Sequence, residues 1–256
     1  MSREHHALLQ NKVPEVTIAF WTIKILSTTV GETGADYLAV HVGLGTTVTI
    51  AIMLTLLAAA LVTQLKQRAY VPWIYWLTVV LVSVVGTQLT DVLTDVLGVS
   101  LYVSTAVFGV LLGLIFEIWY RNEKTLSIHT IVTRKRELFY WAAILVTFAL
   151  GTAAGDLATE AIGLGFSLGV LVFGFLLVMM GMAAYLGANR VLTFWLAYIL
   201  TRPFGASLGD LLSQSREYGG MGMGTIVTSV VFLSVIVILV ILHTATRTRH
   251  SKASAT

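Results

Sequence analysis

One motif recurs four times along this chain of 256 residues, and any fold must accommodate that repetition. In each copy a Gly stands ten residues after the Trp of an aromatic pair, and an Asp stands five residues after that Gly, which gives (F/Y)-W-x9-G-x4-D. The four copies begin at Phe20, Tyr75, Tyr140 and Phe194. Self-similarity of this kind is the sequence sign of an array of like units. We therefore predict four copies of one small structural unit.

The composition is that of an integral membrane protein. Hydrophobic residues make up 57% of the chain and charged residues only 11%, whereas a soluble domain averages about 25% charged residues. The segment Thr225–His243 has no charged residue before its terminal His, and about 20 apolar residues suffice to cross a bilayer. The lipid bilayer is therefore the first predicted partner. The absence of Cys excludes a disulfide framework and thiolate metal sites.

Each unit is predicted to contain two membrane helices. The motif lies in the first helix, and a second apolar stretch follows at about 44–65, 99–120, 163–185 and 225–243. The predicted units are 13–66, 71–121, 137–186 and 190–245, in a single membrane domain over 1–256. We thus expect an all-α protein with eight transmembrane helices. An even number of spans per unit makes the units parallel, with pseudo-symmetry about the membrane normal.

The distribution of Lys and Arg predicts the orientation. These residues gather between the units and in the predicted tails, 1–12 and 246–256, whereas the turns inside the units carry only Arg216. Because cytoplasmic loops carry the excess of Lys and Arg, we predict that both termini are cytoplasmic. This topology accounts for the basic loops, so no nucleic acid is expected as a partner. The N-terminal stretch also lacks the apolar core of a secretory signal.

Acidic residues recur near the outer end of each first helix. The repeated residues are Asp36, Asp91, Asp156 and Asp210, and the further acids are Glu32, Asp95 and Glu160. A spacing of four residues places the paired acids on one helix face. A charge facing lipid costs about 2.5 kcal/mol or more, so these faces are predicted to turn inward and form one shared site or two. Carboxylates are hard oxygen ligands suited to Mg²⁺, Ca²⁺ or Mn²⁺, and we predict the four repeated Asp as metal ligands.

Two basic residues lie within first helices rather than at their ends. Lys24 and Arg202 are predicted either to neutralise the carboxylates or to contact an anionic solute. Pro203 follows Arg202 directly and is expected to kink or interrupt that helix. A broken helix with a charge at membrane depth is one way to build a substrate site.

Other features of the motif have structural interpretations. The repeated Gly is expected to allow close approach of a neighbouring helix, and the repeated Trp to anchor the membrane interface. The Asp residues also have a structural alternative, which is to bond helix ends together. His41, in a predicted outer turn, is interpreted as an interface residue. No resident cofactor is expected, because no two His face each other in mid-membrane and the last helix lacks a Lys for retinal. Enzyme motifs such as GxSxG and HExxH are absent, so no enzyme is predicted.

The stretch "KVPEVTIAFWTIKILSTTVGETGADYL" (Lys12–Leu38) and its three echoes resemble a bacterial membrane family known only as a repeat of unknown function, usually in four copies per chain. The resemblance covers nearly the whole chain, from Lys12 to about His243. It implies a multi-pass protein of the bacterial cytoplasmic (inner) membrane, and it implies no activity. "TAAGDLATE" and "ASLGDLLSQ" are in addition similar to the acidic-x-Gly-Asp pattern of membrane cation exchangers.

These observations leave three hypotheses. The first is a secondary transporter of a cation, with a divalent metal ion as first choice and proton exchange as one option for coupling. The second is a transporter or channel for a small organic solute contacted by Lys24 and Arg202. The third is a non-transporting membrane scaffold. The sequence leaves open whether the chain forms a homo-oligomer.

Overall fold

The computed structural model describes residues 11–40 and 46–253. Within them the regular structure is helical, with no strand. Eight long helices follow one another: α2 (Ile18–Val40), α3 (Thr46–Lys66), α4 (Pro72–Asp91), α5 (Leu101–Glu123), α6 (Arg134–Asp156), α7 (Gly165–Tyr185), α8 (Arg190–Ser213) and α9 (Thr225–Ala253). The all-α prediction is confirmed. His41, most of the predicted tail 1–12 and the end of the tail 246–256 lie outside the described residues.

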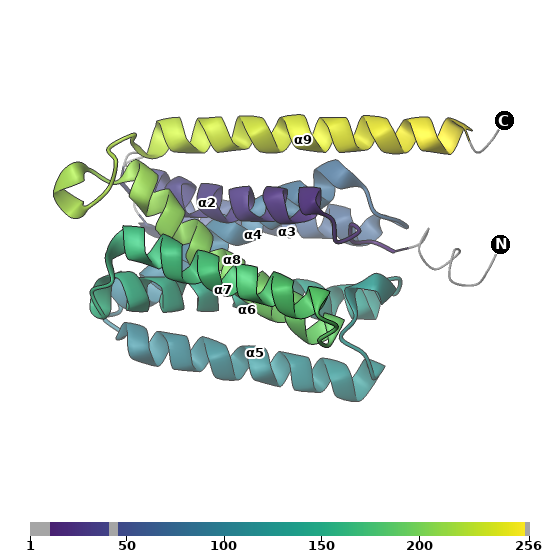
Figure 1. The fold of residues 1–256 in the computed structure, drawn as a ribbon, viewed down its shortest axis with the longest axis horizontal. Coiled ribbons are helices and arrows are strands. Elements are labelled where there is room, and N and C mark those ends of the chain that lie inside the picture. Colours follow the sequence, from purple (N-terminus) through teal and green to yellow (C-terminus); the bar gives the residue numbers. More distant parts are fainter. Residues whose placement is uncertain (1–10, 41–45, 254–256) are drawn as a thin grey trace.

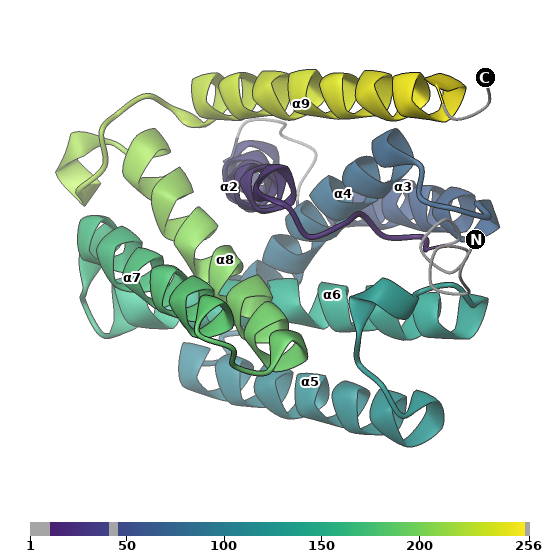
Figure 2. The same ribbon diagram turned by 45° about the vertical axis from the view of Figure 1, so that its right-hand side comes forward.

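The four helices that carry the motif form an inner ring, with the other four outside it. Helix α2 contacts α4, α4 contacts α6, α6 contacts α8, and α8 returns to α2. Each outer helix packs mainly on the inner helix of the next unit: α3 on α4, α5 on α6, α7 on α8, and α9 on α2. In Figure 1 and Figure 2, α9 passes over α2, and α5 lies beside α6. The last helix thereby closes the bundle onto the first unit.

By length and composition, seven of the described helices can cross a membrane. Of the described helices, all except α2 are long and apolar enough to cross a bilayer. Helix α2 carries Lys24, Glu32 and Asp36 together with a run of Ser and Thr, which lowers its hydropathy. Most of its polar residues are nevertheless buried inside the bundle, with Lys24 and Thr28 fully buried. The outer helices instead expose most of their apolar side chains, as lipid-facing helices do.

The aromatic pairs of the motif pack inside one end of the bundle, here called the aromatic end. In every unit the first aromatic residue contacts the Trp of the next unit. The four contacts are Phe20–Trp76, Tyr75–Trp141, Tyr140–Trp195 and Phe194–Trp21, with ring centroids 5.5–6.2 Å apart. The prediction that these Trp residues anchor the membrane interface is wrong for Trp76, Trp141 and Trp195, which are buried. They pack inward because each fills the space between neighbouring inner helices.

The repeated glycines bring the inner helices together. A Cβ on Gly31 would meet Ser83, one on Gly86 would meet Phe148, one on Gly151 would meet Arg202, and one on Gly205 would meet Thr28. All four partners stand seven residues after the Trp of the next unit. The predicted close approach of helices at these glycines is therefore confirmed, and each contact uses equivalent positions.

We expect Gly86→Ala to destabilise the protein, because its Cβ would lie 2.7 Å from the Phe148 Cβ and 3.3 Å from the Ala149 backbone nitrogen. Overpacking of this kind costs about 1–3 kcal/mol. Gly113→Ala is the matched control, since a Cβ on Gly113 meets nothing within 4 Å and Ala favours the helix. Thermal unfolding in detergent measures both variants. Equal melting temperatures for the two would contradict the tight contact.

Candidate functional site

All seven acidic residues singled out from the sequence line one cavity of about 320 Å³. They are Glu32, Asp36, Asp91, Asp95, Asp156, Glu160 and Asp210. We call this space the acidic cavity. It lies where the inner helices end, at the opposite end of those helices from the aromatic pairs. Gln88, Thr94 and Gln214 add polar groups to its lining, while Leu101 and Phe166 contribute apolar side chains.

Two π-helical turns shape the cavity wall. The turn η1 (Val92–Val96) follows Asp91 directly and contains Asp95, and η3 (Leu157–Ala161) follows Asp156 and contains Glu160. Each is closed by a backbone bond between residues five apart, Leu97 N to Val92 O at 3.0 Å and Ile162 N to Leu157 O at 2.9 Å. Isolated π turns occur often at functional sites. Here they carry the second acids into the same cavity as the repeated Asp residues.

The electrostatic character of the acidic cavity favours positive charge. Among the described residues that line it, none is basic. The cavity also lies at the C-terminal ends of inner helices, where the helix dipole adds partial negative charge. Of the seven carboxylates, only Glu32 has an ion-pair partner within the described residues. One oxygen of Asp36 is buried with no hydrogen-bond partner in the described structure.

The partner of Glu32 is Arg202, which is fully buried and contacts residues of the other three inner helices. Its Nη2 lies 2.6 Å from Glu32 Oε2 and 2.7 Å from Thr152 Oγ1, and it also donates to Thr87 Oγ1. Its Nη1 donates to the Thr28 carbonyl oxygen at 3.2 Å. The three side-chain partners stand directly after the repeated Gly in the first three units. One guanidinium from the fourth unit therefore connects equivalent positions of the other three, and we call this arrangement the arginine hub.

Lys24 is enclosed by aromatic rings. Its Nζ lies 3.9 Å from the centroid of the Phe148 ring and 4.2 Å from that of Tyr198. In the described structure this ammonium has no hydrogen-bond partner, so the cation–π contacts are its stabilising neighbours. Neither Lys24 nor Arg202 lines the acidic cavity. Arg202 neutralises one carboxylate of the predicted site, whereas Lys24 forms no ion pair with any described residue.

Pro203 does not interrupt its helix. Helix α8 runs from Arg190 to Ser213 with Pro203 inside it, so the predicted break is not formed. Membrane helices tolerate such a Pro where neighbouring groups satisfy the freed backbone. Pro203 instead packs against the inner ring, close to Gly151 and Gly155 of α6. The unbroken helix carries both Arg202 and Asp210 on one rigid element.

The comparison with protein families agrees with the four-unit architecture. A family model described as Repeat of Unknown Function (DUF347) matches residues 19–70, 74–125, 139–188 and 193–249. The chain belongs to this family. The predicted resemblance to a four-copy repeat family is thereby confirmed. Neither the curated proteins nor the solved structures compared contain a match to this chain.

The carboxylates of the DUF347 units do not form a compact metal centre in this conformation. Within the described residues, no three or more acidic, His or Cys side chains are arranged to hold a metal ion. The predicted coordination by Asp36, Asp91, Asp156 and Asp210 is therefore not supported. The reason is geometric, since these side chains surround a cavity instead of meeting at a point.

Three buried residues of this DUF347 chain have contacts that were not predicted from the sequence. Thr87 and Thr152 complete the arginine hub, and their position after the repeated Gly, the same as that of Glu32, was the available signal. Glu137 is fully buried at the aromatic end, where its Oε2 lies 2.6 Å from the Lys12 Nζ. Lys12, predicted to lie in a cytoplasmic tail, is thus buried with its charge paired.

Proposed function

We propose that this protein is a secondary transporter of a cation, and that the acidic cavity is its binding site. The observation that carries the proposal is the convergence of seven carboxylates from all four units on one cavity without a basic lining residue. Like charges gathered at short range require protons or cations to compensate them. If the repeated Asp residues only bonded helix ends together, second acids such as Asp95 and Glu160 would not be needed in the same cavity.

The four units are, in this proposal, related by pseudo-symmetry about the membrane normal. Three sets of contacts at equivalent positions support it: the aromatic pairs, the glycine contacts and the packing of each outer helix on the next unit. The start of α2 and the end of α9 lie at the same end of the bundle (Figure 1). With the basic segments in the cytoplasm, the acidic cavity faces the outside of a bacterial inner membrane.

In this proposal, three successive sets of side chains close the path from the acidic cavity toward the aromatic end. The arginine hub comes first, and Lys24 lies beyond it between Phe148 and Tyr198. The hydroxyls of Tyr75 and Tyr140 then meet at 2.5 Å. In the proposed cycle this conformation accepts a cation from the acidic end, and movement of the inner helices opens the hub. When Arg202 separates from Glu32, the freed Glu32 carboxylate would bind the cation or a proton.

A divalent metal ion exchanged for protons is the first substrate class to test, and an organic ammonium ion is the second. Two observations support the organic ammonium ion as the second class. The described acids are not arranged as a three-ligand metal site. They line a cavity of about 320 Å³, and small-molecule sites are about 300–1,000 Å³. An anionic solute is disfavoured, since neither Lys24 nor Arg202 reaches the cavity lining.

The test is uptake into proteoliposomes under an imposed pH gradient. We expect wild-type protein to accumulate at least one of Mn²⁺, Zn²⁺, Mg²⁺, Ca²⁺ or a small alkylammonium above protein-free vesicles. Dissipating the pH gradient with an uncoupler distinguishes proton exchange from uniport. Folded protein that moves none of these cations would refute the transporter proposal and favour the scaffold.

A further inference from the structure

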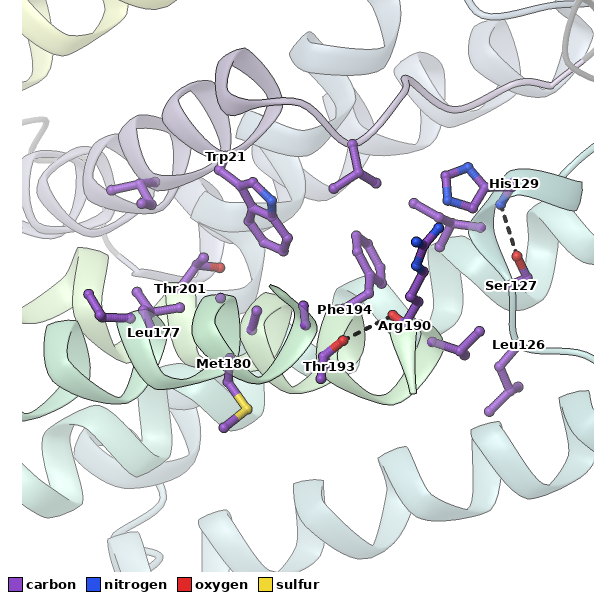
Figure 3. A pocket seen from close by; sticks show the side chains of 18 residues that line it. Trp21, Leu126, Ser127, His129, Leu177, Met180, Arg190, Thr193, Phe194 and Thr201 are labelled. Atoms are coloured by element: carbon purple, nitrogen blue, oxygen red, sulfur yellow. Dashed lines mark hydrogen bonds between the residues drawn. The ribbon is translucent and has the colours of Figure 1, made fainter. Parts of the chain in front are cut away.

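A second, larger cavity of about 830 Å³ lies at the aromatic half of the bundle between α2, α7 and α8. Its lining is mainly apolar and includes Trp21 of α2, Phe194 of α8, and Leu177 and Met180 of α7. Figure 3 shows how the lining side chains lie on these helices. We call it the apolar cavity. It shares no lining residue with the acidic cavity, so it has no part in the proposed cation site.

The apolar cavity has a polar end and an apolar end. Arg190 and His129 lie near one another at one end, while Leu177 and Thr201 lie at the other (Figure 3). Among the described residues that line the cavity, Arg190 is the only one with a full charge, and none is acidic. Its guanidinium has no ion-pair partner within the described residues. The cavity thus combines an unpaired cation with a long apolar interior.

The surroundings place the apolar cavity against lipid. Helix α7 borders it and exposes large apolar side chains, including Val178 at 66% and Met182 at 55%. Arg190 is the first residue of α8 and His129 lies in η2 (Ile128–Thr130), so both stand at the level of the segments between units. The basic segments between units are assigned to the cytoplasmic side, so the polar end of the apolar cavity lies on that side. Basic groups between membrane helices at the cytoplasmic side bind anionic lipid headgroups.

We propose that the apolar cavity binds one anionic phospholipid, with its phosphate on Arg190 and His129 and an acyl chain along α7 and α8 toward Thr201. The charge favours this occupant. A phosphate accepts bidentate hydrogen bonds from a guanidinium, whereas an apolar helix of a second copy would leave Arg190 unpaired. The volume of about 830 Å³ also lies within the range of small-molecule sites.

The test is native mass spectrometry of the full chain released from detergent micelles after incubation with phosphatidylglycerol or phosphatidylcholine. We expect wild-type protein to retain one phosphatidylglycerol in preference to phosphatidylcholine. Arg190→Gln should lower the retained fraction at least fivefold, because the charged contact is lost. Arg134→Gln should leave it unchanged, since Arg134 is likewise exposed, begins its own helix and lies outside the cavity.

A second pair of variants tests the acyl chain without changing charge. A Cβ on Gly181 meets nothing within 4 Å, and this residue lines the cavity, so Gly181→Phe should fill the space and displace the lipid. Gly113→Phe, on the open outer face of α5, should retain it. Equal retention of the two lipids, equal loss in Arg190→Gln and Arg134→Gln, or a dimer in place of the lipid adduct would each overturn the proposal.

Discussion

Arg202→Met is expected to lower the free energy of unfolding by about 3–5 kcal/mol, the cost of leaving one member of a buried ion pair without its partner. Arg202 is fully buried, and its Nη2 lies 2.6 Å from Glu32 Oε2. The substitution would also remove the donor that Thr87 and Thr152 share. Equilibrium unfolding in mixed micelles measures the loss. Arg121→Met is the control, because its pair with Glu117 is exposed, and exposed pairs contribute little.

The double variant Arg202→Met/Glu32→Gln separates an unpaired charge from a packing defect. Replacing both members of a buried pair by neutral groups is often tolerated, so we expect the double variant to be more stable than Arg202→Met alone. If the double variant were as unstable as the single one, the loss would come from packing. The description of Arg202 as the electrostatic hub of the four units would then be wrong.

Asp156→Asn is expected to abolish cation uptake without destabilising the fold. At an effective dielectric constant of about 20, two unit charges 4 Å apart interact by about 4 kcal/mol, and about 1.4 kcal/mol is already tenfold in affinity. We therefore expect uptake at subsaturating cation to fall at least about tenfold. The melting temperature should stay equal or rise, because Asp156 has no ion-pair partner within the described residues and the substitution removes its repulsion with the other acids of the cavity.

Proteoliposome uptake and thermal unfolding on the same preparations measure this pair of effects. Glu117→Gln is the matched control, since Glu117 is an exposed acid on the outer helix α5, away from the acidic cavity. A fall in both uptake and melting temperature for Asp156→Asn would point to a structural role of the carboxylate. Unchanged uptake would remove Asp156 from the site.

The sequence predicted the elements that depend on local pattern. The apolar stretches predicted the helices, and the repeated Gly predicted close contacts such as that of Gly86 with Phe148. The cost of burying charge in lipid predicted that Asp91 and Asp156 turn inward, and both line one cavity. These predictions succeeded because hydrophobicity and residue size act on each helix whatever its partners are.

Features that depend on which helices meet were not predictable. Each outer helix packs mainly on the inner helix of the next unit, and no pattern in the sequence indicates this choice of partner. Trp76 is buried because it packs between neighbouring inner helices, against Phe20 of the preceding unit. The π turns around Asp95 and Glu160 depend on where α4 and α6 meet their neighbours. The pairing of Lys12 with Glu137 joins residues 125 positions apart and has no local signal.

The central claim, that the acidic cavity binds a cation, is tested most directly by cation-dependent protection against unfolding. A ligand at 100 times its dissociation constant stabilises the folded state by about 2.7 kcal/mol. The melting temperature of wild-type protein should rise with the concentration of the transported cation and saturate, while that of Asp156→Asn should rise little. Equal rises in both proteins, or none in wild type for any cation tested, would contradict the claim.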